Sequence, residues 1–489
     1  MKLKMRMEME LLNEQQLRHA LEQAIVVWEK MPFRVQGTDE YFDYLTAYGC
    51  RIDGEMVRFP KPVIDKVLAR HEEEKRRIIA EQASTELPWS GTDLKIFTHG
   101  QGLHICDLET NQLRPCTESD LISWSHAVDR FGDVERDHPT FIPQDAPLGS
   151  QDLHAFATIA LNSRKLHCVS VFSARMLPFF IEISKAVLGS LFTEFKNARE
   201  AGKIFRTMCW INSPFMITRE NIDIAMAARR LLGNPIIFGH MPVAAGSSPV
   251  TVMGSLVQNT AESLALSAMS LAIDGRIHGI QGTTAMIDMR DICQRTVGPD
   301  LFLHRVAAVQ MNSYLLGYHP NFAGTWMNRA TAQSVSAQSL YEKAMNLSFS
   351  FAFGIRNLHI GQLGTSDVGS PVQLLLDYEI IQLYRHMLRE VNTDDEHVGL
   401  ETILATAPRG AYFMETEHTA QFFREECFFP AFVDHRAPLA WAQNPTDMIA
   451  KARQKARDWF ATAKNQCPLS EEQKREIRTI VAEADKAVR

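Results

Sequence analysis

The chain opens with segments in which apolar residues recur at the spacing of an amphipathic helix. LRHALEQAIVVWEKM has this pattern and follows Asn13, which begins a capping box with the glutamine three positions on. A second helix is predicted over KPVIDKVLARHEEEKRRII. Apolar and polar residues then alternate in LKIFTHGQGLHICDLETNQLRPC, which predicts a hairpin. We interpret residues 1–117 as an N-terminal accessory region of helices and a hairpin.

A repeating order of short β-rich runs and helical segments begins near residue 118. Each run ends in Gly, Pro, Ser or Asn, and helical patterns such as ITRENIDIAMAARRLLG and VQNTAESLALSAMSLAIDG lie between the runs. The seven runs are HPTFIPQD, LHCVSVFSA, FRTMCWINSP, NPIIFGHMP, GRIHGIQGTT, GYHPNFAG and RNLHIGQLG. Strand–helix alternation over roughly 250 residues is typical of a (β/α)₈ TIM barrel. We therefore predict an α/β catalytic barrel over residues 118–400, with its eighth strand unidentified.

A doubly wound sheet is the alternative α/β fold for this pattern. It would require a Gly-rich first turn of the dinucleotide-binding kind, and the sequence has none. After residue 370 the chain is helical, through SPVQLLLDYEIIQLYRHMLREV to the amphipathic DMIAKARQKARDWFATAK. We expect residues 401–489 to be a helical extension packed on the barrel. The basic face of the last segment fits a solvated surface or a partner-docking helix.

Composition excludes several classes of function. The net charge of −7 gives no electrostatic footprint for nucleic acid. No apolar run approaches the ~20 residues of a membrane helix, and the first residues lack the apolar core of a signal peptide. The eight cysteines form no C-x-x-C pair, so neither a zinc knuckle nor a disulfide framework is predicted. We expect a soluble, cytoplasmic protein.

The carboxyl ends of barrel strands are where catalytic residues of this fold lie. In this chain those ends carry Ser173, Trp210, Asn212, His240, Gln281, Phe322, Trp326, His359 and Gln362. The set is aromatic and polar, without the paired acids and bases of general acid–base catalysis, and without the ligand spacing of a zinc site. The histidines could equally be satisfied core residues, and the aromatic residues could be packing.

Taken together, these side chains suit a quaternary ammonium substrate. Aromatic faces attract such a cation by about 0.5–2 kcal/mol per ring, and its reaction needs no general base. What it needs is a methyl group held in line with an incoming nucleophile.

Several segments, in the same order, resemble the trimethylamine methyltransferase family of corrinoid-dependent methyltransferases. They are GLHICDLETNQLRPCTESDL, VQNTAESLALSAMSLA, MIDMR, SLYEKAM, LLLDYEII and TEHTAQFFREECFFP, spread from about residue 38 to 460. The resemblance implies a TIM barrel whose mouth meets a cognate corrinoid-binding protein, whose cobalt(I) takes a methyl group from a bound amine. It also implies that the corrinoid (cobalamin) comes with that partner, that no cofactor or metal is held tightly, and that the chain forms a homo-oligomer.

One segment departs from the family pattern. Archetypal members carry pyrrolysine before the YEK helix, where it is thought to engage the amine. Here that region reads TAQSVSAQSLYEK, with Gln333 near the pyrrolysine position and no lysine analogue. A tertiary amine needs an activating group before it can leave. A quaternary ammonium leaves as a neutral tertiary amine and needs none, and a desolvated pocket favours its reaction with a reduced cobalt centre.

The hypothesis is a quaternary-amine:corrinoid-protein methyltransferase with glycine betaine as the first candidate substrate. Proline betaine, carnitine, γ-butyrobetaine and trimethylamine are the alternatives. The cage would be Phe322, Trp326 and Trp210, and the carboxylate would be oriented by His240, His359, Gln281 and Gln362. No residue is assigned to catalysis, although His359 is the candidate if one exists. Two functions of other classes stay open: a barrel lyase, which would need a Schiff-base lysine or metal carboxylates, and a non-catalytic module that binds betaine or corrinoid protein.

Overall fold

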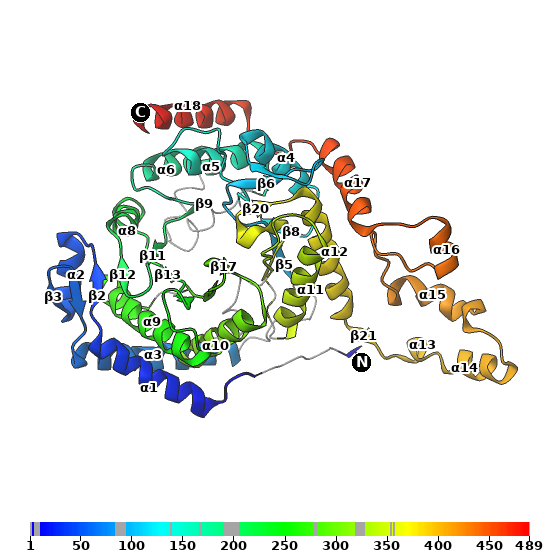
Figure 1. Cartoon of the computed structure of the whole chain (residues 1–489), viewed down its shortest axis with the longest axis horizontal. Helices are drawn as coiled ribbons and strands as arrows, with labels where there is room; N and C mark the ends of the chain where they lie inside the picture. Colours follow the sequence, from blue (N-terminus) through cyan, green and yellow to red (C-terminus); the bar gives the residue numbers. More distant parts are fainter. Residues whose placement is uncertain are drawn as a thin grey trace.

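The computed structural model is an α/β structure in which helices surround short strands (Figure 1). It describes residues 2–3, 10–83, 94–136, 139–165, 169–189, 205–277, 281–317, 328–352, 355 and 357–488. Within those residues no helix is long and apolar enough to cross a membrane.

Parallel strands form three groups inside the ring of helices (Figure 1). The first group orders β18 (Asn357–His359), β5 (Lys95–Phe97) and β8 (Val134–Arg136), the second pairs β10 (Phe205–Arg206) with β9 (Val169–Ser170), and the third orders β11 (Cys209–Trp210), β13 (Phe238–His240) and β15 (Gln281–Gly282). All three are parallel, as successive strand–helix units require. Among the described residues the groups are not joined into one closed sheet.

Most of the predicted strands are confirmed, with two exceptions. HPTFIPQD contains no strand, since Phe141 makes only an isolated bridge with Gly102, and the strand lies just before it, in β8. LKIF does not belong to the predicted hairpin, because β5 pairs with β18 and β8 instead. The hairpin itself is confirmed downstream, as β6 (His104–Cys106) against β7 (Leu113–Pro115). Beyond Gly317, the run GYHPNFAG lies outside the described residues.

The helices of the ring follow the predicted periodicities. They are α4 (Glu118–Val128), α5 (Gln151–Asn162), α6 (Leu177–Leu188), α8 (Arg219–Leu232), α9 (Val252–Asp274), α10 (Pro299–Leu316), α11 (Ala337–Ala352) and α12 (Pro371–Met387). Thr117 caps α4 and Ser370 caps α12, each by accepting a hydrogen bond from a backbone N–H of the first turn with its side chain. Helix α9 is buried almost all around, because small and apolar residues cover every face of it.

The N-terminal region packs against α9 and α10. It contains α1 (Glu14–Lys30), α2 (Asp39–Tyr48) and α3 (Lys61–Ala83), and a sheet ordered β12 (Met216–Ile217), β2 (Phe33–Val35), β4 (Met56–Arg58) and β3 (Arg51–Asp53). The capping box of Asn13 with Gln16 is confirmed. Two small sheets lie elsewhere: β14 (Val243–Ala244) with β16 (Ala285–Asp288) and β17 (Cys293–Arg295), and β19 (Gln362–Leu363) with β20 (Val368–Gly369), β6 and β7.

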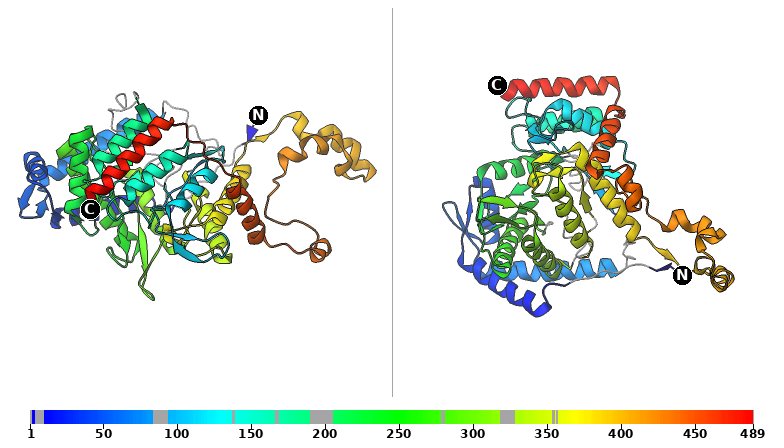
Figure 2. Two further views of the ribbon diagram at one scale, coloured as in Figure 1. Left: turned by 90° about the horizontal axis from the view of Figure 1, so that it is seen from above. Right: turned by 45° about the vertical axis from the view of Figure 1, so that its right-hand side comes forward.

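The C-terminal part divides into a projecting segment and two packed helices (Figures 1 and 2). Strand β21 (Val391–Asn392), paired with β1 (Lys2–Leu3), begins the projection, and α13 (Asp395–Val398), α14 (Leu400–Thr406), α15 (Glu417–Glu426) and α16 (Pro438–Gln443) follow. Helices α17 (Met448–Ala461) and α18 (Glu471–Val488) return to the body, where they bury alanines and Ile477. The predicted division into three regions stays a prediction.

Candidate functional site

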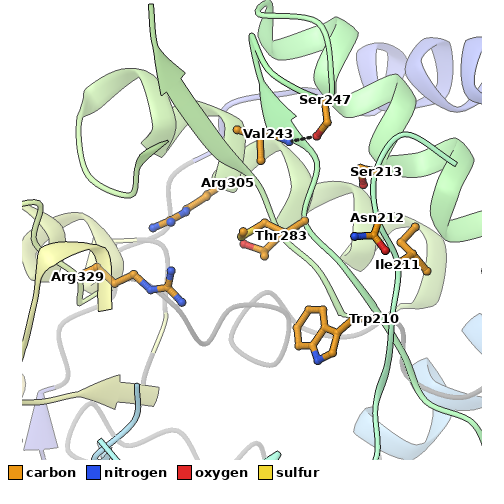
Figure 3. A pocket seen from close by; sticks show the side chains of 10 residues that line it. Trp210, Ile211, Asn212, Ser213, Val243, Ser247, Thr283, Arg305 and Arg329 are labelled. Atoms are coloured by element: carbon orange, nitrogen blue, oxygen red, sulfur yellow. Dashed lines mark hydrogen bonds between the residues drawn. The ribbon is translucent and has the colours of Figure 1, made fainter. Parts of the chain in front are cut away.

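A pocket of about 400 Å³ opens where the strands of the third parallel group end (Figure 3). It is lined by Trp210, Ile211, Asn212, Ser213, Met241, Val243, Ser247, Thr283, Arg305 and Arg329. Its volume is within the range of small-molecule sites. The lining combines apolar side chains, neutral polar groups and two arginines, and includes no acid or lysine among the described residues.

The pocket has a cationic side and an aromatic side (Figure 3). Arg305, from α10, and Arg329 direct their guanidinium groups into it from one side, and Trp210 and Asn212 lie on the other. The Trp210 ring lies across the backbone of Gly239, where a Cβ would come within 2.8 Å of the ring. Glycine at this position of β13 therefore lets the indole cover the strand and face the pocket.

Both arginines are buried, at 5% and 9% exposure. Burial, together with the positive charge of Arg329, lowers the pKa of Arg305 to about 9. Burial also lowers the pKa of Arg329 to about 10. Arg305 Nε donates to the carbonyl of Thr284 at 3.2 Å. Two like charges drawn together in a low-dielectric site repel each other, and an anion bound at the pocket would relieve that repulsion.

Polar residues of α9 fix the loops that carry the lining. Gln258 Nε2 donates to the carbonyl of Ser247 at 2.6 Å. Glu262, fully buried, accepts from the hydroxyl of Ser213 at 2.7 Å and from a neighbouring backbone N–H. Asn259 Nδ2 donates to the carbonyl of Thr283 at 3.2 Å. The VQNTAES segment contributes no lining residue; it forms a wall behind the lining, and its polar residues are explained by the loop backbone that they hold.

Helix α11 fixes the segment that carries Arg329 in the same way. Glu342 accepts from the backbone N–H groups of Thr331 and Ala332, at 2.6 and 3.1 Å. Asn346 Nδ2 donates to the Arg329 carbonyl at 2.7 Å. Because α11 holds the backbone at Arg329, Thr331 and Ala332, it sets the position from which the Arg329 guanidinium extends.

A buried ion pair completes this wall. Lys343 Nζ lies 2.9 Å from Asp377 Oδ2, with both side chains fully buried, and donates to the Asn328 carbonyl at 2.9 Å. Asp377 also accepts from Gly361 N and Gln373 Nε2, both at 2.8 Å. Burial lowers the pKa of Lys343 and raises that of Asp377, but each charge opposes the shift of the other. Each member of the pair has its hydrogen-bond partners within 2.9 Å, as a buried ion pair requires.

The predicted site residues on the third strand group are split between pocket and core. Trp210 and Asn212 line the pocket. His240 does not, because it is fully buried and its Nε2 donates to Asn259 Oδ1 at 3.0 Å, which holds the ring against α9. Gln281 pairs with Gly239 through its backbone, and its side chain lies outside the described residues.

None of the other predicted residues is among the described residues that line the pocket. Phe322 and Trp326 lie outside the described residues. His359 is buried on β18, with its ring 4.4 Å from Phe97 and 4.7 Å from His99 between centroids. Gln362 is buried, and neither atom of its amide has a hydrogen-bond partner among the described residues. Gln333 is exposed, with Nε2 donating to the carbonyl of Thr331, and Ser173 accepts from the N–H of Arg175.

Sequence reasoning missed both arginines. Arg329 lies three residues after Trp326 and two before the TAQSVSAQSLYEK segment, and it is not among the predicted site residues. Arg305 lies in LFLHRVAAVQ, where the residues three and four positions before and after it are Leu301, Phe302, Ala308 and Val309. The usable signal was an arginine on the apolar face of a helix, because such a charge is buried only where it has a task or a partner.

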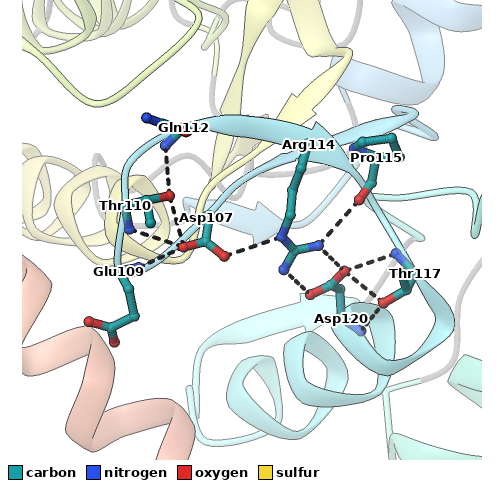
Figure 4. Close-up of polar contacts among 8 residues, drawn as sticks. All are labelled: Asp107, Glu109, Thr110, Gln112, Arg114, Pro115, Thr117 and Asp120. Carbon is teal, nitrogen blue, oxygen red and sulfur yellow. Dashed lines mark hydrogen bonds and ion pairs between the residues drawn. The ribbon is translucent and has the colours of Figure 1, made fainter.

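The first motif of the resemblance is structural (Figure 4). Arg114 binds both carboxylate oxygens of Asp120 at 2.7 Å, and contacts Asp107 at 3.2 Å. Asp120 also accepts from the N–H and hydroxyl of Thr117. Burial would raise the pKa of Asp120, but these bonds outweigh it and lower the pKa. GLHICDLETNQLRPCTESDL therefore joins the hairpin to α4 and contributes no group to the pocket.

Comparison with known proteins places the chain in one family. Residues 2–488 match the family described as trimethylamine methyltransferase (MTTB). The chain is 24% identical to trimethylamine methyltransferase MttB1 of Methanosarcina mazei over 85% of this chain and 81% of that protein. It is also 24% identical to the glycine betaine methyltransferase of Desulfitobacterium hafniense, over 71% of this chain and 70% of that protein.

Among solved structures, the chain aligns with the Methanosarcina barkeri monomethylamine methyltransferase (MtmB) at 10% identity and a TM-score of 0.37, covering 93% of both chains. The family match spans nearly every residue, from the N-terminal strand to the last helix. The chain therefore belongs to the trimethylamine methyltransferase family.

Proposed function

We propose that this protein transfers a methyl group from a carboxylate-bearing quaternary amine, glycine betaine first, to the corrinoid of a partner protein. The observation that carries the proposal is the pair of buried arginines opposite Trp210 in one pocket. The carboxylate of a betaine would bind the two arginines, and its trimethylammonium group would pack on Trp210. Membership of a methyltransferase family that includes a glycine betaine methyltransferase supports the reaction.

The two ends of the substrate would bind by different physics. Guanidinium groups bind carboxylates through paired, charge-assisted hydrogen bonds, and Arg305 and Arg329 converge on the pocket for that purpose. The trimethylammonium group has no hydrogen-bond donor, and would pack on the Trp210 face by cation–π attraction. This assignment moves the carboxylate from the predicted His240, His359, Gln281 and Gln362 to the arginines. Phe322 and Trp326 keep their predicted place in the cage.

Trimethylamine fits this pocket less well. It lacks the carboxylate, so it would make no charge-assisted hydrogen bond to either arginine. Proline betaine, carnitine and γ-butyrobetaine carry both groups, and differ in the distance between them. The pocket, at about 400 Å³, is large enough for glycine betaine, the smallest of the candidate betaines.

The chemical step asks little of the protein. One N–CH₃ bond breaks with its electron pair going to nitrogen, so the leaving group is a neutral tertiary amine and no proton moves. The corrinoid, brought by its carrier protein as a co-substrate, supplies the nucleophilic cobalt that accepts the methyl group. The side chains hold the substrate, orient one methyl group outward and exclude water. The lack of an acid or base among the described lining residues agrees with this chemistry.

We also infer that the three parallel strand groups belong to one (β/α)₈ barrel. Their strands lie within the ring of helices, as the barrel requires (Figure 1). β5 supplies the strand that the sequence left unidentified.

A barrel lyase is disfavoured by one observation. The buried lysine on α11, Lys343, is held by Asp377 and the Asn328 carbonyl and does not line the pocket, so it offers no Schiff-base amine there. A non-catalytic betaine-binding module would use the same pocket residues, and would differ only in leaving the bound betaine methylated.

The test is methyl transfer with a reduced corrinoid protein from the same organism, and with reduced free cobalamin as a second acceptor. Each betaine and trimethylamine would be added separately, with the visible spectrum of the corrinoid and the demethylated amine as readouts. We expect dimethylglycine from glycine betaine. Conversion of trimethylamine alone would contradict the substrate. Binding without any demethylated amine would favour the binding module.

A further inference from the structure

Glu262, on helix α9, has a buried carboxylate that lies directly behind the pocket lining. Its side chain is fully buried, and it is not among the residues that line the pocket. Its Oε2 accepts a hydrogen bond from the hydroxyl of Ser213 at 2.7 Å, and Ser213 is a lining residue. One hydrogen-bonded side chain therefore separates the Glu262 carboxylate from a bound ligand.

The contacts of Glu262 are those of an ionised carboxylate. Besides the Ser213 hydroxyl, it binds the backbone N–H of Phe215 at 3.1 Å and Nε2 of Gln258 at 3.2 Å, both through Oε1. A backbone N–H and an amide NH₂ can only donate, and donors directed at both oxygens stabilise the charged form. Every partner that the structure describes for Glu262 is neutral, so none of them cancels its charge.

This carboxylate lies on the aromatic side of the pocket. Ser213 follows Trp210 and Asn212 in the chain, and all three lie on the side of the pocket opposite the two arginines (Figure 3). The negative charge of Glu262 is therefore on one side of the pocket and the positive charges are on the other. Such a charge distribution favours a zwitterion whose cationic end lies at the aromatic side and whose anionic end lies at the arginines.

We propose that Glu262 determines the specificity of the pocket for a cationic head group, by acting as a counter-charge to the trimethylammonium group from behind Ser213. This inference rests on the proposed function, because it takes the orientation of the betaine from it. A buried charge acts over a longer distance than the contact between a cation and an aromatic ring, since protein screens it less than water does. Glu262 touches neither the substrate nor the reacting atoms, so it is a positioning residue.

Holding the loop and attracting the cation are two separable roles for Glu262. A displaced loop would weaken the binding of every ligand of the pocket, whatever its charge. A lost counter-charge would weaken only the ligands that have a cationic head group. The compound 3,3-dimethylbutanoate distinguishes the two roles, because it has the shape and the carboxylate of glycine betaine with a carbon atom in place of the quaternary nitrogen.

The test is calorimetric titration of the wild type, E262Q and E342Q with glycine betaine and with 3,3-dimethylbutanoate at neutral pH. The wild type should bind glycine betaine about tenfold more tightly or better. E262Q should lower that ratio of affinities by about fivefold or more, with the affinity for 3,3-dimethylbutanoate unchanged or higher. E342Q is the matched control, because it also removes a buried carboxylate, but from the wall behind Arg329. It should weaken both ligands equally and keep the ratio.

Three results would overturn the inference. If the wild type bound both ligands equally, the pocket would not recognise a cation, and the proposed function would fail as well. If the wild type preferred glycine betaine and E262Q kept the full ratio, the proposed function would stand and the role of Glu262 would be rejected. If E262Q weakened both ligands by the same factor, Glu262 would only hold the loop, and the inference would again be wrong.

Discussion

The wall of the pocket and the arm are built on opposite rules. In the wall, polar and charged side chains such as Glu262, Glu342 and Lys343 are buried, and each is satisfied by loop backbone or by an opposite charge. In the projecting arm, residues 391–446, apolar side chains such as Leu404 and Met414 are exposed, and the described residues of the chain do not cover them. Each is a departure from an ordinary globular core, in which apolar groups are inside and polar groups outside.

The difference separates what the chain completes alone from what it completes with others. Buried polar groups in the wall hold loops to within a hydrogen-bond length, and they set the position of the pocket arginines before any ligand arrives. The exposed arm residues, by contrast, carry an unfavourable free energy that a covering surface would remove, and the pocket arginines present charge to a ligand. The wall therefore predicts losses of stability on mutation, and the pocket and arm predict losses of binding.

The largest effect is expected from breaking the buried ion pair. D377L leaves the Lys343 ammonium buried without its counter-charge, which should lower the free energy of unfolding by about 3–5 kcal/mol. The double variant K343M/D377L should recover much of that loss, because it buries no uncompensated charge. The midpoint of urea unfolding measures both. A double variant as unstable as D377L would show that the wall depends on the hydrogen bonds of the pair rather than on its charge balance.

The second effect separates binding from folding. R329M and R305M should weaken glycine betaine by at least about 30-fold, since each removes a charge-assisted bond to a buried carboxylate worth about 2–5 kcal/mol. Their unfolding midpoints should change little without ligand, because each also removes one of two buried like charges. Calorimetric titration gives the affinity, and R18M, on the surface of α1, is the control. If R329M unfolded at the same urea concentration as D377L, Arg329 would be needed for stability as the wall residues are, and the prediction would be wrong.

The strand–helix order, the helix starts and the hairpin could be predicted because they are local. Capping residues such as Thr117 and Ser370 and the periodicity of α8 and α9 fix these elements within a few residues of chain. The sequence could also predict that Trp210 and Asn212 lie at the pocket, because Trp210 ends a strand and Asn212 comes two residues later.

The rest depended on contacts between distant segments. The sequence predicts β5 as part of a hairpin because its true partners are hard to recognise. β18 is far away in the sequence, and β8 has a weak strand pattern. His240 is predicted as a site residue because it ends a strand, but Asn259, on the following helix, binds its ring in the core. Arg305 and Arg329 come from different elements and meet only in the folded chain.

A smaller effect is expected from the aromatic side of the pocket. W210L should weaken glycine betaine about 3- to 30-fold, since one cation–π contact contributes about 0.5–2 kcal/mol. W210F should lose less, because it keeps an aromatic face. Inhibition by acetate, which occupies only the arginines, should be the same in both variants and in the wild type. An equal loss of acetate and betaine binding in W210L would mean that the pocket had collapsed rather than lost a cation contact.

The smallest effect is that of pH. A base is fully charged well below its pKa and loses its charge as pH rises through that pKa. The pKa of Arg305 is lowered to about 9, so its charge is half lost near pH 9. Betaine affinity should be flat between about pH 6 and 8 and decline above about 9, and a bound carboxylate would shift the decline upward. In R305M the decline should start later. A decline centred near neutral pH would point to a histidine, such as His359, as the group that binds the carboxylate.

The central claim is that one pocket recognises a cation and a carboxylate in the same molecule. Calorimetric titration of the wild type with glycine betaine, tetramethylammonium and acetate, repeated on R329M, tests it without any corrinoid. We predict that betaine binds at least tenfold more tightly than either fragment, and that R329M reduces betaine to the affinity of tetramethylammonium. Equal affinities for betaine and tetramethylammonium in the wild type, with no change in R329M, would contradict it.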